Sequence, residues 1–175
     1  MRRGLVETYR MAGRLGGGRA KLLAEAALRL VLVRAALRLR PFEKVARRFG
    51  TFVAPGVRHA SDGSRAGAEA AQAVAWAVAV AARRLPGEFV CLPQALAAQA
   101  MLLRRGVAAS LYLGAGREEA GPFEAHAWVE AAGIAVTGHP VPPQLREMGR
   151  FVAVPPDGKA GDAGGGRSVS REQAR

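Results

Sequence analysis

The sequence predicts an α+β fold in which helices precede a small antiparallel sheet. Apolar residues recur at helical spacing from Ala20 to Arg40, and small apolar residues fill residues 66–84 in a second helical run. Residues 107–116 predict a strand that ends in glycine, and residues 124–139 predict a β-hairpin. At 175 residues the chain is long enough for one domain with its own core.

The first segment, residues 1–50, predicts a basic helical arm. Pro41 ends or kinks its long helix, and Phe42 to Phe49 predict a second, short helical piece. The segment holds thirteen Lys or Arg against three Glu, so +10 of the net charge of +12 lies in it. Charges at every four or five residues exclude an ordinary membrane span, which needs about 20 mostly uncharged residues.

The charge of this arm has two interpretations. It would attract an acidic partner, an anionic membrane surface or nucleic acid. Alternatively, it is the solvated face of a helix in a chain rich in Arg and Ala. Since no aromatic-rich basic strand supports base stacking, we do not expect nucleic acid to be the partner.

Residues 51–154 predict the globular domain itself. The stretch 51–67 is expected to be a loop by its Pro, Gly, Ser and Asp content, with Ser64 placed to cap the next helix. A last short strand is expected at Phe151 to Val154. Residues 155–175 contain much glycine and almost no apolar residues, so they predict a disordered tail.

Composition excludes several classes of protein. Half of the residues are hydrophobic, which argues against bulk disorder. A single cysteine cannot form an intramolecular disulfide, and three scattered histidines offer no zinc-type spacing, so we expect neither a metal nor another cofactor. The N-terminus lacks the pattern of a signal peptide, and a cytoplasmic location is expected.

Cys91 is the first candidate for chemistry. It comes directly before a predicted helix over residues 93–105, in which Pro93 suits the first turn. At a helix N-terminus, unpaired backbone N–H groups and the helix dipole stabilise a thiolate, and the same groups can hold an oxyanion during acyl transfer. The alternative is that Cys91 packs as a small buried hydrophobe.

His126 is the second candidate. It lies in the predicted strand AHAWVE, where alternation places His126, Trp128 and Glu130 on one face and the alanine and valine residues on the other, buried face. From there an imidazole can act as the general base for a cysteine on the neighbouring helix. Alternatively, His126 is a structural residue of the strand.

A third group usually orients the histidine of such a pair. Glu130 is four residues away along the strand, about 13 Å, which is too far. If the hairpin turns through two residues at Ala132-Gly133, His126 faces His139; if it turns through three, it faces Gly138. Neither supplies a carboxylate, so His139 and a backbone carbonyl are the candidates, and the alternative for His139 is an exposed loop histidine.

Three sequence motifs resemble those of a known family. They are the helix CLPQALAAQAMLLRRG with the strand after it, the strand FEAHAWVE, and the return strand GIAV. Together they resemble the transglutaminase-like cysteine protease domain of lasso-peptide biosynthesis B proteins, the leader peptidases of that pathway. The similarity runs from about Ala66 to Val154, and the Arg-rich helix Leu28 to Arg40 is similar to the N-terminal part of those proteins.

The resemblance implies a transglutaminase-like and papain-like fold in which Cys91 is the nucleophile and His126 its base. The reaction would remove the leader from a ribosomally made precursor peptide. The partners implied are the precursor, a lasso cyclase and a leader-recognition protein. Because residues 1–50 predict helices rather than the strand-containing recognition domain, that protein is expected to be a separate chain.

The positions of the surrounding residues suggest roles for them in this reaction. Backbone N–H groups at the helix start, including that of Leu92, and the side chain of Gln94 are expected to stabilise the oxyanion. Trp128 is expected either to line the active-site cleft beside His126 or to pack on the sheet as an ordinary structural residue. The family pattern can place an aspartate about twelve residues after the histidine, where this chain has Gly138.

Two functions of other classes stay open. The first is a degenerate protease fold that binds the precursor or a partner without cleaving it, and the glycine at position 138 is the feature that favours it. The second is an interaction protein in which the basic arm binds nucleic acid or an anionic membrane and the globular part is a scaffold. Among enzymes, a Cys-His pair serves acyl transfer as well as hydrolysis.

Overall fold

The computed structural model describes residues 17–56, 64–117 and 121–155. The helices are α2 (Gly17–Leu39), α3 (Phe42–Ala46), α4 (Arg65–Arg84) and α5 (Cys91–Leu103). The strands are β1 (Thr51–Val53), β2 (Ala109–Gly116), β3 (Glu124–Ala131), β4 (Ile134–Thr137) and β5 (Arg146–Ala153). The predicted α+β fold, with a cysteine-led helix against a small antiparallel sheet, is confirmed.

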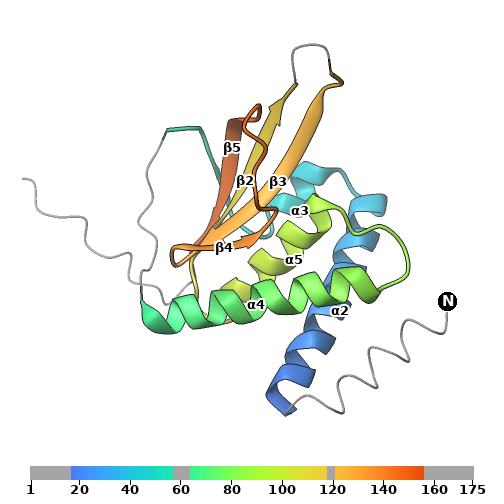
Figure 1. Ribbon diagram of the computed structural model, residues 1–175, viewed down its shortest axis with the longest axis vertical. Coiled ribbons are helices and arrows are strands. Elements are labelled where there is room, and N and C mark those ends of the chain that lie inside the picture. Colours follow the sequence, from blue (N-terminus) through green and yellow to red (C-terminus); the bar gives the residue numbers. More distant parts are fainter. Residues whose placement is uncertain (1–16, 57–63, 118–120, 156–175) are drawn as a thin grey trace, which may run out of the picture.

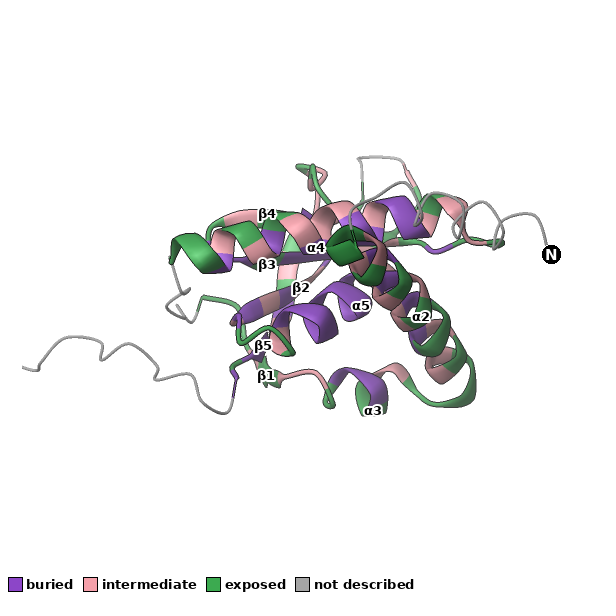
Figure 2. Ribbon diagram, turned by 90° about the horizontal axis from the view of Figure 1, so that it is seen from below, coloured by how far each residue is buried: buried purple, intermediate pink, exposed green. Residues whose placement is uncertain are grey.

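The molecule has a sheet on one side and its helices on the other (Figure 1). Seen from below, α5 lies between the sheet and α2, and its residues are mostly buried (Figure 2). The core therefore forms where α5 meets the apolar faces of β2 and β3, with α4 and α2 closing it from outside. Leu96, Met101 and Leu111 are fully buried in this core.

The helix α2 belongs to this core through one face. Leu23, Ala26, Leu30 and Val33 repeat at helical spacing and are buried. At the far end of α5, the carboxylate of Glu25 pairs with Arg105 at 2.5 Å and with Arg104 at 3.2 Å. The apolar face and these ion pairs together hold α2 against α5. None of the helices among the described residues has the length and apolar character needed to cross a membrane.

Local signals in the sequence explain where α4 begins. The hydroxyl of Ser64 accepts a hydrogen bond from the N–H of Gly67 at 3.1 Å, as expected of an N-cap residue. The helix ends at Arg84, before Leu85-Pro86-Gly87. On α5, the buried side chain of Gln99 donates to the carbonyl of Phe151 at 2.8 Å, which ties the helix to β5.

The sheet is antiparallel, with strand order β1-β5-β2-β3-β4. The hairpin between β3 and β4 turns through Ala132 and Gly133, whose φ angles of 49° and 75° fit a two-residue turn of type I′. The two-residue alternative is thus confirmed. A register shift between Val129 and Glu130 then moves β4 by one residue against β3.

Two of the predictions for the sheet are wrong. Residues 51–53, which their composition predicts to be part of a loop, form β1, which pairs with β5. The last strand begins at Arg146 rather than Phe151, because its first half pairs with Leu113 to Ala115 of β2. Apart from Pro155, the predicted tail lies outside the described residues, as does the arm before Gly17.

Candidate active site

Cys91 is the first residue of α5, and its side chain is partly exposed. The residue before it, Val90, occupies the N-cap position and makes no side-chain hydrogen bond to the helix. Pro93 has no N–H, and the N–H of Gln94 reaches the carbonyl of Val90 at 3.4 Å. The N–H groups of Cys91 and Leu92 are therefore left without a capping side chain, which leaves them available to an anion.

The side chain of Gln94 bends back toward the segment that leads into the helix. Its amide nitrogen donates to the carbonyl of Phe89 at 2.5 Å. One of its two N–H bonds is thus engaged in holding the chain next to Cys91, and the other is left for a ligand. Leu92 turns its side chain against the hydrophobic core, so only its backbone can serve the site.

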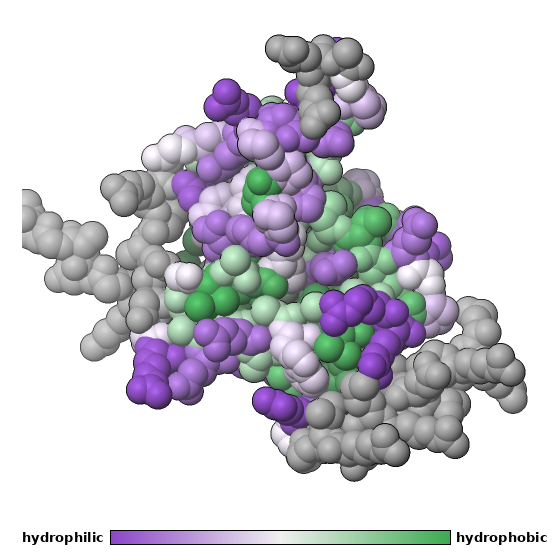
Figure 3. Space-filling model, viewed as in Figure 1, coloured by the Kyte–Doolittle hydropathy of each residue, from purple (hydrophilic) through white to green (hydrophobic). Residues whose placement is uncertain are grey.

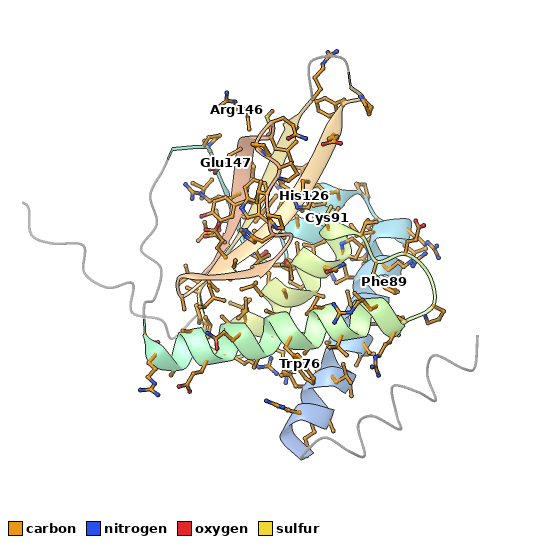
Figure 4. The ribbon with its side chains drawn as sticks, viewed as in Figure 1. Trp76, Phe89, Cys91, His126, Arg146 and Glu147 are labelled. Carbon is orange, nitrogen blue, oxygen red and sulfur yellow. The ribbon has the colours of Figure 1, made fainter. Side chains whose placement is uncertain are left out.

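His126 lies on a part of β3 that has a strand on one side. It pairs with Gly114 of β2, whereas β4 pairs with β3 only from Val129 to Ala131. On the other edge β4 ends at Thr137, and Gly138, the next residue, lies beside Ala127 and Trp128 of β3. Cys91 begins α5 and His126 lies on β3, two elements that pack together (Figure 4), and His126 is on the face of β3 opposite the core-facing Ala127.

The ring of His126 is held by a backbone carbonyl. Its Nε2 atom lies 2.7 Å from the carbonyl oxygen of Gly138. A carbonyl oxygen only accepts, so Nε2 carries the proton and Nδ1 of the neutral ring keeps a free lone pair. Within the described residues no hydrogen bond joins Nδ1 to the Cys91 thiol; such bonds between catalytic groups are often long without substrate.

Gly138 stands where a carboxylate is expected, and the local backbone excludes one. Its φ of +76° is in the left-handed region. A Cβ atom there would lie 2.5 Å from the carbonyl oxygen of Ala127 and 2.8 Å from Cβ of Trp128. With glycine at this position, the backbone carbonyl reaches His126. No carboxylate side chain can stand there.

His139 does not contact His126 in the structure. Its Nε2 atom lies 3.8 Å from Oε1 of Glu130 instead. Of the candidates for orienting His126, the geometry therefore selects the backbone carbonyl. Glu130 faces His139 rather than the active site.

Trp128 joins His126 to a column of side chains on the face of the sheet away from the core. Its ring stacks on His126, with centroids 6.2 Å apart, and on Tyr112, at 5.3 Å and an angle of 5°. The guanidinium of Arg150 covers the other side of Tyr112 and donates to its hydroxyl at 3.1 Å. Because Trp128 is only 8% exposed, this column fixes the plane beside which the imidazole lies.

The sequence signalled only some of these residues. The alternation in AHAWVE correctly placed Trp128 with His126 and buried Ala127 and Val129, but Ala125, which was expected on the buried face, is exposed. Tyr112 lies in a predicted strand, but its pairing with Trp128 depends on the register between β2 and β3, which cannot be predicted from the sequence. Arg150 lay outside the predicted strand. No three His, Cys, Asp or Glu residues of the described ranges are grouped so that they could hold a metal ion.

Comparison with known proteins supports the same architecture. The family described as the transglutaminase-like superfamily matches residues 36–149, more than half of the chain. This range includes both Cys91 and His126. No curated protein and no solved structure matches the chain.

Proposed function

Because the chain belongs to the transglutaminase-like superfamily, we propose that it is a cysteine peptidase in which Cys91 attacks and His126 serves as general base. The observation that carries this proposal is the hydrogen bond from Nε2 of His126 to the Gly138 carbonyl. It leaves Nδ1 as the only ring nitrogen that can accept the thiol proton. The uncapped start of α5 supplies the rest of the site.

The reaction has two halves. Nδ1 of His126 takes the proton of the Cys91 thiol, and the sulfur forms a bond to the carbonyl carbon of the substrate peptide. The N–H groups of Cys91 and Leu92 stabilise the resulting oxyanion. The carbon–nitrogen bond then breaks as His126 returns the proton to the leaving amine. Water, deprotonated by the same histidine, finally hydrolyses the thioester and frees the thiol.

A carbonyl differs from a carboxylate in what it does for His126. It fixes the tautomer and orients the ring, and it accepts the N–H of the imidazolium that forms during the reaction. It carries no full negative charge, so it stabilises the imidazolium less than an aspartate would. A slower enzyme is therefore expected, since loss of the charge in a triad lowers the rate without abolishing catalysis.

The substrate that we propose is a ribosomally made precursor peptide, cleaved at the end of its leader during lasso-peptide maturation. The motifs around Cys91 and His126 support this assignment, since they resemble those of the leader peptidases of that pathway. A separate leader-recognition protein and a lasso cyclase are the proposed partners. The basic surface of α2 is compatible with a partner that is acidic.

The test is a cleavage assay with a lasso precursor and its recognition protein, followed by mass spectrometry. The parent should release the intact leader, and Cys91→Ala and His126→Ala should abolish release. His139→Ala is the matched control and should retain activity, because His139 does not contact His126. Cleavage that persists in Cys91→Ala would contradict the assignment of the nucleophile.

One observation favours a second candidate, a degenerate module that binds the precursor or a partner without cleaving it. No carboxylate among the described residues forms a hydrogen bond with His126, and Gly138 leaves no room for one at its own position. In that case neither the parent nor Cys91→Ala cleaves the precursor, and both bind it with equal affinity. A binding titration run beside the cleavage assay separates the two functions.

A further inference from the structure

A groove of about 350 Å³ lies between α2 and α3, and it takes no part in the chemistry at Cys91. Its apolar lining includes Leu32, Leu39 and Phe49. Three arginines lie around this lining: Arg29, Arg40 and Arg48. No acidic residue lines the groove among the described residues. The groove therefore offers a ligand an apolar floor, and the three arginines form a basic rim around it.

The apolar lining continues as a stripe along the outer side of α2. Leu28, Leu32 and Leu39 are 58%, 53% and 82% exposed, and their spacing places them on one face of the helix. Exposed residues follow this outer side in Figure 2. In Figure 3, hydrophobic residues reach the surface between hydrophilic ones on the side where the helices lie. Contiguous exposed leucines of this kind mark an interaction site.

Two of the three arginines around the groove, Arg40 and Arg48, are available for a partner. Arg29 is half-buried, and its charge helps to lower the pKa of Glu25. The guanidinium groups of Arg40 and Arg48 form no hydrogen bond or ion pair within the described part of the chain, whereas that of the neighbouring Arg47 pairs with Glu43. These two guanidinium groups beside the groove thus have no carboxylate partner in the ranges that the structure describes.

The chain's own ends do not match this surface. Residues 1–16 contain four arginines and a single glutamate, so they carry the same charge as the rim. Residues 156–175 are rich in glycine and offer one large apolar side chain, that of Val169. A second copy of the chain would bring the same arginines together, which like-charge repulsion opposes. The occupant is therefore a different molecule.

We propose that this groove binds an acidic amphipathic helix of a partner protein. Leucine-type side chains of that helix fill the groove, as in other helix-in-groove complexes, and its carboxylates pair with Arg40 and Arg48. A protein fits better than a lipid bilayer because the surface is hollowed between two helices and its cations are arginines, which bind carboxylates in a planar fork. The inference is independent of the reaction at Cys91.

The probe for a binding test is a fluorescein-labelled synthetic helix with leucines at i, i+3, i+4 and i+7 and glutamates at the other positions. Fluorescence anisotropy with the full-length chain measures its affinity. We expect Arg40→Glu/Arg48→Glu to weaken binding by about tenfold or more, because like charges then meet across the interface. Leu39→Ser should also weaken it, and this highly exposed position tolerates substitution without loss of the fold.

The matched control is Arg38→Glu/Arg83→Glu, which changes the net charge equally at two exposed arginines outside the groove. It should bind the probe nearly as well as the parent. A probe with lysines in place of the glutamates should prefer the Arg40→Glu/Arg48→Glu variant. Equal losses in both double variants would overturn the proposal, since net charge alone would then explain binding.

The membrane is tested with vesicles of equal parts phosphatidylcholine and phosphatidylglycerol. We expect weak binding that falls equally in both double variants. If the parent binds these vesicles through Arg40 and Arg48 but does not bind the peptide, the groove is a membrane-binding surface and the proposal is wrong. Absence of binding to both probes overturns it as well. Circular dichroism confirms that each variant is folded.

Discussion

The ring of His126 donates its Nε2 proton to the carbonyl oxygen of Gly138 across 2.7 Å. This one hydrogen bond connects the strand that carries the proposed base to the chain that leaves β4. It also explains why glycine stands at a position where a carboxylate was expected, since the carbonyl needs a backbone with φ of +76°. The orienting group is thus built from backbone.

Replacing Gly138 by Ala should therefore lower both stability and activity. The left-handed backbone and the close approach to Ala127 and Trp128 together should cost about 3 kcal/mol in the free energy of unfolding. The displaced carbonyl should also release His126. Urea denaturation measures the first effect, and the rate of precursor cleavage measures the second.

Gly133→Ala is the matched control for this substitution. Gly133 has nearly the same φ, +75°, but no atom lies within 4 Å of a Cβ added there. We expect it to cost about 1 kcal/mol, from backbone conformation alone. Equal losses of stability at the two positions would contradict the close packing at Gly138. Gly138→Asp should likewise fail to raise activity, because its side chain has no room.

Trp128 should position His126 by stacking on it. Trp128→Phe keeps an aromatic face between His126 and Tyr112 and should retain most of the activity. Trp128→Leu removes the stack, and we expect a fall in kcat larger than any change in KM. Trp76→Leu on α4 is the control for the loss of a tryptophan. If Trp128→Leu raises only KM, Trp128 contacts substrate instead.

Stability should depend on pH through Glu25. Burial raises the pKa of its carboxyl, but the hydrogen bond and charge of Arg105, with the charges of Arg104 and Arg29, lower it further, so the net pKa lies below the ordinary 4.5. A carboxyl with a lowered folded-state pKa stabilises the fold at neutral pH. That stabilisation is lost as the pH falls from 4.5 through the folded-state pKa.

Glu25→Gln should accordingly lower the free energy of unfolding by about 1 kcal/mol at pH 7, since the pair is partly exposed. The difference from the parent should vanish in acid, below the folded-state pKa of Glu25. Glu43→Gln removes the exposed pair with Arg47 and should change stability little at any pH. A Glu25→Gln deficit that persists in acid would show that the side chain acts through packing instead.

The helices and the hairpin turn could be predicted because their signals are local. Ser64 caps α4, Gly133 accepts the positive φ of the turn, and apolar spacing marks α2. The face that His126 shares with Trp128 followed from strand alternation alone. Each of these features depends on residues within a few positions of one another.

The remaining features depend on partners that are distant in sequence. Residues 51–53 form a strand only because β5 lies beside them, about a hundred residues later. The register shift near Val129 has no sequence signal, and neither has the hydrogen bond between His126 and the carbonyl of Gly138, twelve residues later. For the same reason the column from His126 to Arg150 could not be assembled from the sequence, since it spans three strands.

The most direct test of the Cys91–His126 pair is the rate at which iodoacetamide alkylates Cys91, measured against pH. In the parent we expect fast reaction at slightly acidic pH, and we expect His126→Ala to slow it while His139→Ala leaves it unchanged. This pattern would show an accessible thiol coupled to the imidazole. A Cys91 that reacts slowly and equally in all three proteins would contradict the account and identify Cys91 as a packing residue.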